Sequence, residues 1–186
     1  MSTKNELLNS ILEVLSNNID KMKFVYDEID PSAHDNYAIC FAAENGHSEV
    51  VKLLLNDERV DPSAGNNYAI CHAAENGHVE VVKLLLNDKR VDSSVGKHYA
   101  ICSAAENGHS EVVKLLLNDE RVDPSAVYNY AIRHAAENGH VEVVKLLLND
   151  KRVDPSADNN YAMHLALKYG HLQLVRLLVN DKRFTL

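Results

Sequence analysis

The stretch AAENGHSEVVKLLLNDERVD, residues 42–61, decides the fold because the chain repeats it. Close copies begin at Ala73, Ala104 and Ala135, at an interval of 31 residues, and a looser copy, LALKYGHLQLVRLLVNDKR, begins at Leu165. Self-similarity at a period of 20 to 50 residues is typical of repeat architectures. The repeated unit is therefore the natural starting point for predicting the structure.

One unit contains the signals for two helices. In the second copy, residues 67–76 (NYAICHAAEN) predict a short helix with Ile70, Ala73 and Ala74 on one face. Gly77 should end it, since glycine is the usual residue where a helix terminates in a left-handed turn. Residues 79–88 (VEVVKLLLND) predict a second helix with a broad apolar face, and a proline-containing turn follows in most copies. Each unit is thus expected to be helix, turn, helix and a hairpin-like loop.

A single unit cannot fold alone. The few apolar side chains that it buries cannot offset the conformational entropy lost in ordering its backbone. Neighbouring units must cover each other's apolar faces, so the copies should stack into a solenoid.

These units resemble ankyrin repeats, whose pattern is TPLHxAAxxGHxEVVKLLLxxGADVN. Residues 73–86, AAENGHVEVVKLLL, match its second half almost letter for letter, and the resemblance covers about residues 31–186. It implies an all-α ankyrin-repeat solenoid of stacked helix-turn-helix units with short hairpin-like loops. We expect one continuous domain with five repeats at residues 31–61, 62–92, 93–123, 124–154 and 155–186. Residues 1–30 should form a degenerate N-terminal helical capping pair.

The variant letters DPSA, NYAI and DxRVD also resemble repeats in large DNA viruses of amoebae and some protists. The TPLH of the family is replaced here, for example by Tyr68-Ala69-Ile70-Cys71. Because the usual threonine cap is missing, we predict that asparagines cap the first helices instead, since asparagine is a strong N-cap. These are Asn36, Asn67, Asn129 and Asn160, and His98 should be the weakest cap.

The repeated histidines and cysteines do not predict chemistry. His47, His78, His109, His140 and His171 follow the glycines, and equivalent positions in stacked helices lie roughly 8–10 Å apart. Zinc ligands must converge on one centre, so these histidines should instead hydrogen-bond loop backbone groups. Cys40, Cys71 and Cys102 occupy one repeat position and are expected to be packing residues. Without a converging set of unlike groups, we predict no enzyme activity, no metal and no cofactor.

The bulk composition limits the partners. The net charge is −8, and lysine and arginine recur beside glutamate and aspartate without forming a basic stripe, which argues against nucleic acid and anionic membranes. The N-terminal MSTKNELLNSILEVL reads as an amphipathic helix and not as a signal peptide. An odd number of cysteines fits a reducing compartment. We expect a soluble, intracellular, cytoplasmic protein, and the sequence does not exclude the nucleus.

The copies differ mainly at two places. One is the loop tip, and the other is a first-helix position occupied in turn by Phe41, His72, Ser103, His134 and Leu165. In ankyrin-type stacks, this helix face and the loop tips line the concave groove that binds partners. The resemblance therefore implies a partner-binding set of His34, Asp35, Tyr37, Phe41, Asn66, Tyr68, His72, Lys97, His98, Tyr99, Ser103, Tyr128, Tyr130, Arg133, His134, Asp158, Asn159, Tyr161 and Leu165.

Two simpler interpretations stay open for this set. The tips can vary because they are solvated, and the tyrosines can serve only to cover the loop base. Phe41 and Tyr128 are the strongest candidates for true contacts, since exposed aromatic side chains are enriched at binding hot spots.

The leading function is a non-enzymatic protein-protein interaction module that is monomeric and binds another protein, which would be a host protein if the chain is viral. No F-box-like tail follows the last predicted helix, so recruitment to a ubiquitin ligase is not expected. The alternative is a structural spacer or self-assembling scaffold, driven by Leu177, Leu178 and Phe184 near the C-terminal face.

Overall fold

The computed structural model describes residues 30–91 and 96–184, and of Gly96 and Lys97 only the backbone. The predicted N-terminal capping pair lies outside these residues. Within them the chain is helical, without strands. The helices are α3 (Ala33–Glu44), α4 (Ser48–Leu55), α5 (Ala64–Glu75), α6 (Val79–Asn87), α7 (Gly96–Glu106), α8 (Ser110–Leu117), α9 (Ala126–Glu137), α10 (Val141–Asn149), α11 (Ala157–Lys168) and α12 (Leu172–Val179).

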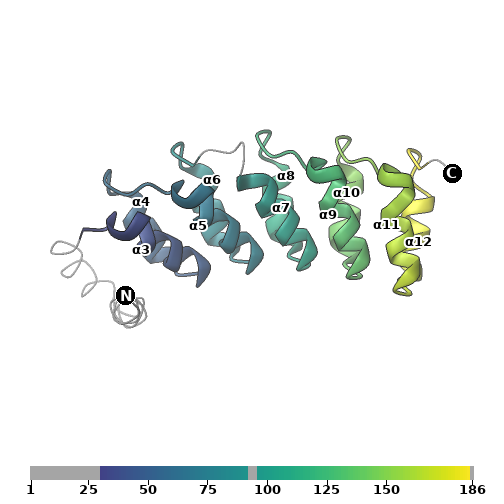
Figure 1. The fold of residues 1–186 in the computed structure, drawn as a ribbon, viewed down its shortest axis with the longest axis horizontal. Coiled ribbons are helices and arrows are strands. Elements are labelled where there is room, and N and C mark those ends of the chain that lie inside the picture. Colours follow the sequence, from purple (N-terminus) through teal and green to yellow (C-terminus); the bar gives the residue numbers. More distant parts are fainter. Residues whose placement is uncertain (1–29, 92–95, 185–186) are drawn as a thin grey trace.

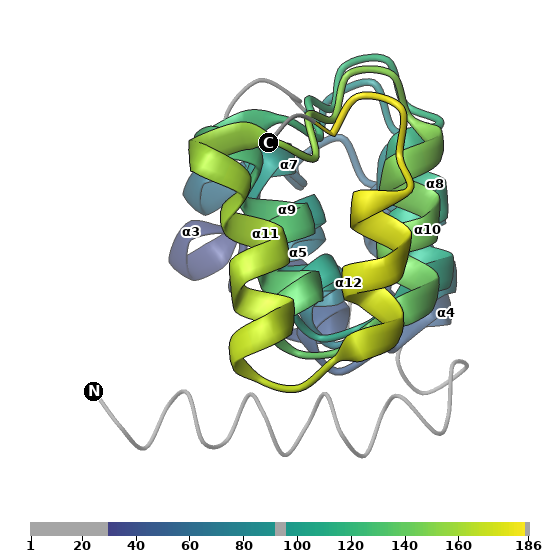
Figure 2. The same cartoon turned by 90° about the vertical axis from the view of Figure 1, so that its right-hand side faces the viewer.

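The helices pair along the chain and the pairs stack side by side in one row (Figure 1). Viewed along the row, the first helices of the pairs, α3, α5, α7, α9 and α11, form one layer, and the second helices form another (Figure 2). Each first helix contacts the next first helix, and each second helix the next second helix. The all-α solenoid predicted from the repeats is therefore confirmed.

The core lies between the two layers and repeats with the sequence. In α5, Ile70, Ala73 and Ala74 are fully buried, as predicted from their spacing. Alanine has almost no side chain, so neighbouring first helices can approach closely there. The second helices contribute residues such as Val82 and Leu85, and the valine that follows each arginine of the loops is buried as well.

A glycine ends each first helix in the way the sequence predicts. Gly77 has a φ of +75°, its N–H donates to Ala74, and the N–H of His78 donates to Ala73. This pair of bonds is the Schellman motif, which satisfies carbonyls at the helix end. The same two bonds recur after α3, α7 and α11, and after α9 the N–H of His140 donates to Ala135 in the same way.

The histidine after each glycine ties its unit to the preceding one. His78 Nε2 donates to the carbonyl oxygen of Glu44 at 2.9 Å, and His109, His140 and His171 repeat the bond at 2.8–2.9 Å. The prediction that these histidines bind loop backbone groups is confirmed. The imidazole ring also lies close to the glycine of the preceding unit. A Cβ added to Gly46 would lie 2.6 Å from His78 Nδ1.

The arginine of each loop makes a second tie, which the sequence analysis missed. Arg152 forms a fork with Asp150, its own neighbour two residues earlier, through Nε and Nη2. Its guanidinium also donates to the carbonyls of Val122 and Leu117 in the preceding unit, at 2.7 and 3.1 Å. Arg90 and Arg183 make the equivalent contacts.

The predicted asparagine caps are wrong. Before the right-handed part of α3, α5, α9 and α11, three residues adopt a left-handed turn, as in His34, Asp35 and Asn36 with φ of 55–61°. The asparagine side chain makes no cap bond to its own helix there; instead, Asn36 Oδ1 accepts the N–H of Asp61 in the next unit at 2.7 Å. Asn129 accepts from Asp154 in the same way at 2.9 Å.

His98 stands at the asparagine position in α7. Its Nδ1 accepts the N–H of Asp123 at 3.3 Å, a longer contact than the two asparagine bonds. His98 thus accepts the same hydrogen bond from the next unit at a longer distance, and it does not cap a helix.

Candidate protein-binding face

The outer side of the first-helix layer carries the varied residues. We call it the first-helix face and define it by the tyrosine column (Tyr37, Tyr68, Tyr99, Tyr130 and Tyr161), the varied helix position (Phe41, His72, Ser103, His134 and Leu165) and the left-handed turns that precede the tyrosines. The tyrosines point from successive helices at the same repeat position, and Tyr99, at 54%, is the most exposed of the column.

A tyrosine, a histidine and a glutamate form the same cluster on α5 and on α9. The rings of Tyr68 and His72 lie 3.9 Å apart between centroids, and His72 Nδ1 lies 3.0 Å from Glu75 Oε2. Tyr130, His134 and Glu137 repeat the arrangement, with 3.8 and 3.0 Å. The prediction that these residues share a helix face is confirmed.

The short contact between His72 and Glu75 is not a well-formed hydrogen bond. Glu75 Oε2 is buried and has no hydrogen-bond partner, although the ring nitrogen lies close to it. Proximity alone does not make a hydrogen bond, because the N–H must also point at the acceptor oxygen. The carboxylate therefore keeps an unsatisfied acceptor on this face.

Tyrosine hydroxyls join neighbouring units across this face. Tyr130 donates to Glu106 Oε2 at 2.8 Å and Tyr68 donates to Glu44 Oε2 at 3.3 Å. Burial, and then the bond to Glu106 and its negative charge, raise the pKa of Tyr130 to about 12. Tyr130 therefore stays protonated and keeps donating at physiological pH.

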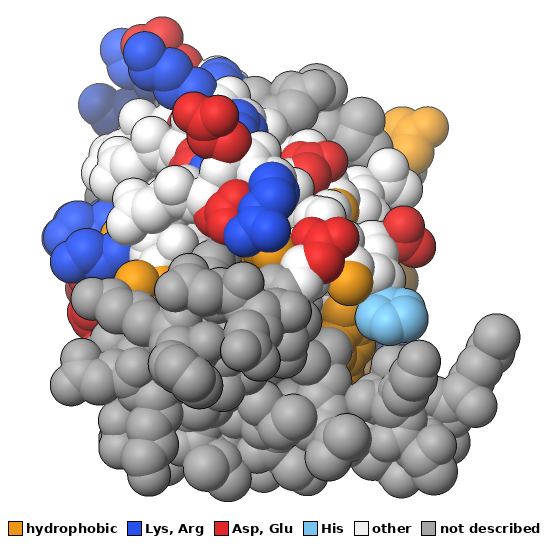
Figure 3. All heavy atoms as spheres, turned by 90° about the vertical axis from the view of Figure 1, so that its left-hand side faces the viewer, with side chains coloured by type: hydrophobic (Ala, Val, Ile, Leu, Met, Phe, Trp, Pro, Cys, Tyr) orange, Lys and Arg blue, Asp and Glu red, His pale blue; other side chains and the backbone are white. Residues whose placement is uncertain are grey.

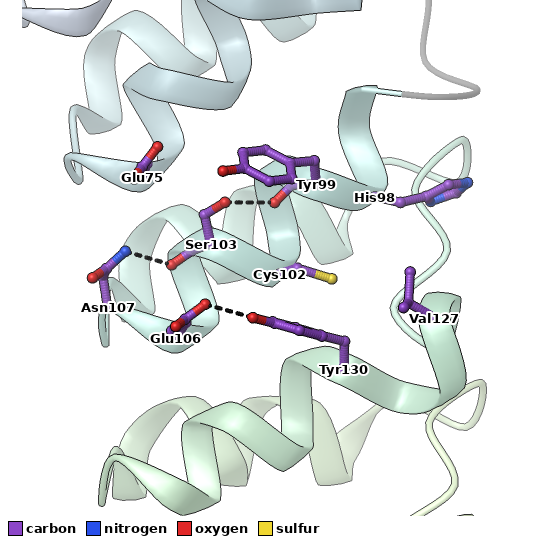
Figure 4. A pocket seen from close by; sticks show the side chains of 9 residues that line it. All are labelled: Glu75, His98, Tyr99, Cys102, Ser103, Glu106, Asn107, Val127 and Tyr130. Carbon is purple, nitrogen blue, oxygen red and sulfur yellow. Dashed lines mark hydrogen bonds between the residues drawn. The ribbon is translucent and has the colours of Figure 1, made fainter.

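A hollow of about 670 Å³ opens on the face between α7 and α9 (Figure 4). Tyr99, Cys102, Ser103 and Glu106 of α7 line it, together with Tyr130 of α9. Glu75 from the preceding unit and His98, Asn107 and Val127 complete the lining. Ser103 turns its hydroxyl back to the carbonyl of Tyr99 at 2.8 Å, as Figure 4 shows. Ser103 belongs to the predicted partner-binding set, but the hollow was not predicted. Its signal in the sequence is a small side chain where other units carry a ring or leucine.

Two predicted contact residues are less accessible than expected. Phe41 is half-buried, because it packs against the core and stacks on Tyr37 with 6.0 Å between ring centroids. Leu165 is only 5% exposed. The prediction of an exposed Phe41 and of Leu165 as a surface contact is wrong.

Arg133 already has partners within the chain. It donates to Asp158 Oδ2 and to the carbonyl of Val127, both at 3.2 Å, and its guanidinium lies 5.5 Å from the ring centroid of Tyr161. This arginine therefore belongs to the junction between α9 and α11. The side chain of Lys97 lies outside the described residues.

The left-handed turns place the predicted tips in solvent. His34, Asp35, Asn66, Asp158 and Asn159 are all exposed, and Tyr128, at 80%, is the most exposed large hydrophobic side chain among the described residues. Val127 and Tyr128 adopt φ of 52° and 56°. A positive φ is unusual for a β-branched residue, so this tip is held by the turn around it.

The cysteines are inert packing residues. Cys71 and Cys102 are buried, and burial raises the pKa of each thiol to about 12 and that of Cys40 to about 11. Within residues 30–91 and 96–184, no three His, Cys, Asp or Glu side chains come together as a possible metal site. Each helix there is too short or too polar to cross a membrane. Seen from the N-terminal end, acidic and basic side chains both occur on the described part of the surface (Figure 3).

Comparison with known families gives one match. A family described as "Ankyrin repeats (3 copies)" matches the chain three times, at residues 4–97, 39–127 and 98–185. The first match extends into the region expected to form the N-terminal cap. A search among curated proteins found no match.

Proposed function

This chain belongs to the ankyrin-repeat family, and from that premise we propose that it is a non-enzymatic module that binds a partner protein through the first-helix face. Ankyrin repeats generally mediate protein-protein interaction. The observation that carries the proposal here is the tyrosine column, whose members Tyr68, Tyr99 and Tyr161 are exposed on three of the units, with Tyr128 exposed beside them. Exposed aromatic side chains in a row are costly to leave in water and are enriched at binding hot spots.

The acidic character of the chain supports a partner that is a protein with a basic or neutral surface. The net charge is −8, and Glu75 and Glu106 lie on the face beside the tyrosines. For a chain of viral origin, as the narrower resemblance predicts, the partner would be a host protein. Monomeric state and intracellular location remain predictions.

Capture from cell lysate with identification by mass spectrometry tests the proposal. Tyr99→Ala and Tyr128→Asn should together reduce recovery of a specific partner at least about 10-fold, as expected for the loss of two aromatic contacts. Asparagine is a matched replacement at position 128, because Asn66 and Asn159 stand at the same turn position.

The control variant is Val79→Ser on the second-helix layer, which copies Ser48 and Ser110 at the same repeat position. It should recover the partner as wild type does. Equal recovery by all three proteins would remove the first-helix face from the proposal.

Self-association through the C-terminal end is the second candidate. Of the residues first expected to drive it, Leu178 is fully buried and Leu177 and Phe184 are half-buried. Leu167, Tyr169, Leu172 and Val179 are exposed at that end instead. Light scattering at high concentration tests this candidate; a wild-type dimer that Leu172→Ser dissolves would support it, and a strict monomer would end it.

A further inference from the structure

The hollow beside Ser103 exists because one unit lacks a ring. Phe41, His72 and His134 stand at the same repeat position, and each lies against the tyrosine of its own helix at 6.0, 3.9 and 3.8 Å between ring centroids. Ser103 has no ring to place there. The face of Tyr99 is left uncovered, and a space of about 670 Å³ opens between it and Tyr130.

The walls of this hollow combine aromatic rings with carboxylates. Tyr99 and Tyr130 supply the rings and Cys102 an apolar floor. Glu106 accepts the Tyr130 hydroxyl on Oε2, which leaves its other oxygen without a hydrogen-bond partner among the described residues. Glu75 also lines the hollow and has a buried oxygen that accepts no hydrogen bond. No lysine or arginine is part of the lining.

Aromatic rings beside two carboxylates together suit a guanidinium. Its planar face stacks on aromatic rings, and its five N–H groups match carboxylate oxygens in a fixed fork. An ammonium is a more strongly hydrated point charge and cannot stack in this way. The wall chemistry therefore favours arginine over lysine.

One unit further along, the chain itself places an arginine against a tyrosine ring and a carboxylate. Arg133 stands at the repeat position of Cys102, and its guanidinium lies 5.5 Å from the centroid of Tyr161, the next member of the tyrosine column. It pairs there with the carboxylate of Asp158. The junction between α9 and α11 is thus filled from within the chain by the group that the junction between α7 and α9 lacks.

We propose that the hollow is the receptor for an arginine side chain of the partner protein, stacked between Tyr99 and Tyr130 and paired with Glu75 and Glu106. The inference rests on the proposed function, since it names the chemistry that a partner must present to the first-helix face. It makes the unit around α7 the specificity-determining one.

Titration with N-acetyl-arginine amide, followed by NMR of the labelled full chain, tests this receptor. A ligand of this size should bind with a Kd on the order of 1 mM, and the backbone signals of Tyr99, Ser103, Glu106 and Tyr130 should shift together. N-acetyl-lysine amide should bind at least about 5-fold more weakly, and N-acetyl-citrulline amide, which keeps the shape but lacks the charge, at least about 10-fold more weakly.

Ser103→His is the matched variant, because histidine fills this position in α5 and α9. It should fold as wild type, close the hollow and abolish the shifts. Glu106→Gln keeps an acceptor for Tyr130 and should weaken binding about 10-fold. His72→Ser opens the equivalent space beside Tyr68 and should add a second set of shifts on α5.

The outcomes separate the receptor from the function. Absence of shifts with arginine, equal binding of citrulline, or unchanged binding by Ser103→His would overturn the receptor. If Ser103→His also recovers a partner that the Tyr99 and Tyr128 variant loses, partner binding stands and the arginine receptor falls. If arginine binds as described while the Tyr99 and Tyr128 variant recovers every protein as wild type does, the receptor stands and the proposed function falls.

Discussion

The glycines after the first helices all adopt a left-handed conformation, and all but Gly170 are also packed against a histidine ring of the next unit. Gly108 has a φ of +79°, and a Cβ there would lie 2.6 Å from Nδ1 of His140 in the next unit. Gly170 has a φ of +78°, but nothing lies within 4 Å of its added Cβ. A side chain at either position would therefore be destabilising because of the left-handed backbone. Only at Gly108 would it also clash with a neighbouring ring.

Replacement of both glycines by alanine should separate these costs. Gly170→Ala should lower the free energy of unfolding by about 1–2 kcal/mol, the cost of a left-handed conformation. Gly108→Ala should lower it by a further ~1–3 kcal/mol through overpacking against the imidazole. Chemical denaturation measures both.

A double-mutant cycle provides the control for that comparison. In a His140→Ala background, Gly108→Ala should cost no more than Gly170→Ala does in wild type, since the clashing ring is gone. An unchanged cost in that background would show that the ring plays no part.

Val127 adopts a left-handed conformation without being a glycine, and this strains its backbone. Its φ of 52° and ψ of 49° suit glycine, asparagine or aspartate, and other units carry Gly65 or Asp158 at this position. Val127→Asn should raise the free energy of unfolding by about 1 kcal/mol. The control is Asn66→Asp, which copies Asp35 at the same turn position and changes no β-branched residue; it should stay within ~0.5 kcal/mol. Equal effects of the two variants would contradict the strain.

At the scale of the element, the loop fork joins two helical pairs. Arg152 holds Asp150 and reaches the carbonyls of Leu117, the last residue of α8, and Val122. Carbonyls at a helix C-terminus lack intrahelical partners, so the fork satisfies groups that would otherwise need water.

Arg152→Lys should therefore destabilise the stack although it keeps the charge. A lysine cannot pair with Asp150 and reach both carbonyls at once, so the free energy of unfolding should fall by about 1–2 kcal/mol. Lys151→Glu is the control, since Glu58 and Glu120 stand at that position in other copies. A loss of stability as large in the control would point to the charge of the loop instead of the fork.

The helices were predictable because their signals are local. The alanine and isoleucine spacing, the glycine and the valine-leucine run each act within one unit, and the copies repeat them. The fork was not predictable in this way, because the carbonyls that Arg152 reaches lie 30 and 35 residues earlier and become neighbours only in the stack. The asparagine caps were predicted wrongly for a different reason. Asparagine is common both at N-caps and in left-handed turns, and here the left-handed turn lets its side chain bond to the next unit.

The positions that form the candidate face could be predicted from the sequence, but the exposure of their side chains and the hollow could not. Comparison of the copies located Tyr128 and the varied helix position. Whether a side chain there is covered depends on packing across units, so the half-buried Phe41, the buried Leu165 and the hollow beside Ser103 needed the structure.

At the scale of the whole molecule, the repeated aspartates make stability depend on acid. Hydrogen bonds from Arg90, Arg152 and Arg183 lower the pKa of Asp88, Asp150 and Asp181 below the ordinary value of 3.8. Hydrogen bonds from Ser125 lower that of Asp123 in the same direction. The folded chain therefore binds fewer protons than the unfolded chain near that pH.

The free energy of unfolding should depend on pH because of this difference in bound protons. The contribution of these carboxylates is present above pH 3.8 and is lost as the pH falls through their lower folded-state values. The urea midpoint should change little between about pH 7 and pH 5 on their account and fall steeply below about pH 4.

Asp150→Asn removes one of these groups. It should lower the midpoint at neutral pH and reduce the further loss in acid. A midpoint that rises as the solution becomes acidic would contradict the linkage.

The ties between units also have a direction. The bonds of the histidines that follow the glycines, of the loop arginines and of the column tyrosines are donated by the later unit to acceptors on the earlier one, as His109 does to Glu75 and Arg183 to Val153. The bond from Arg133 to Asp158 is the exception. During synthesis on the ribosome the earlier unit emerges first. Each newly made pair of helices can then dock onto acceptors that are already in place, so the stack can grow from its N-terminal side without reopening what has folded.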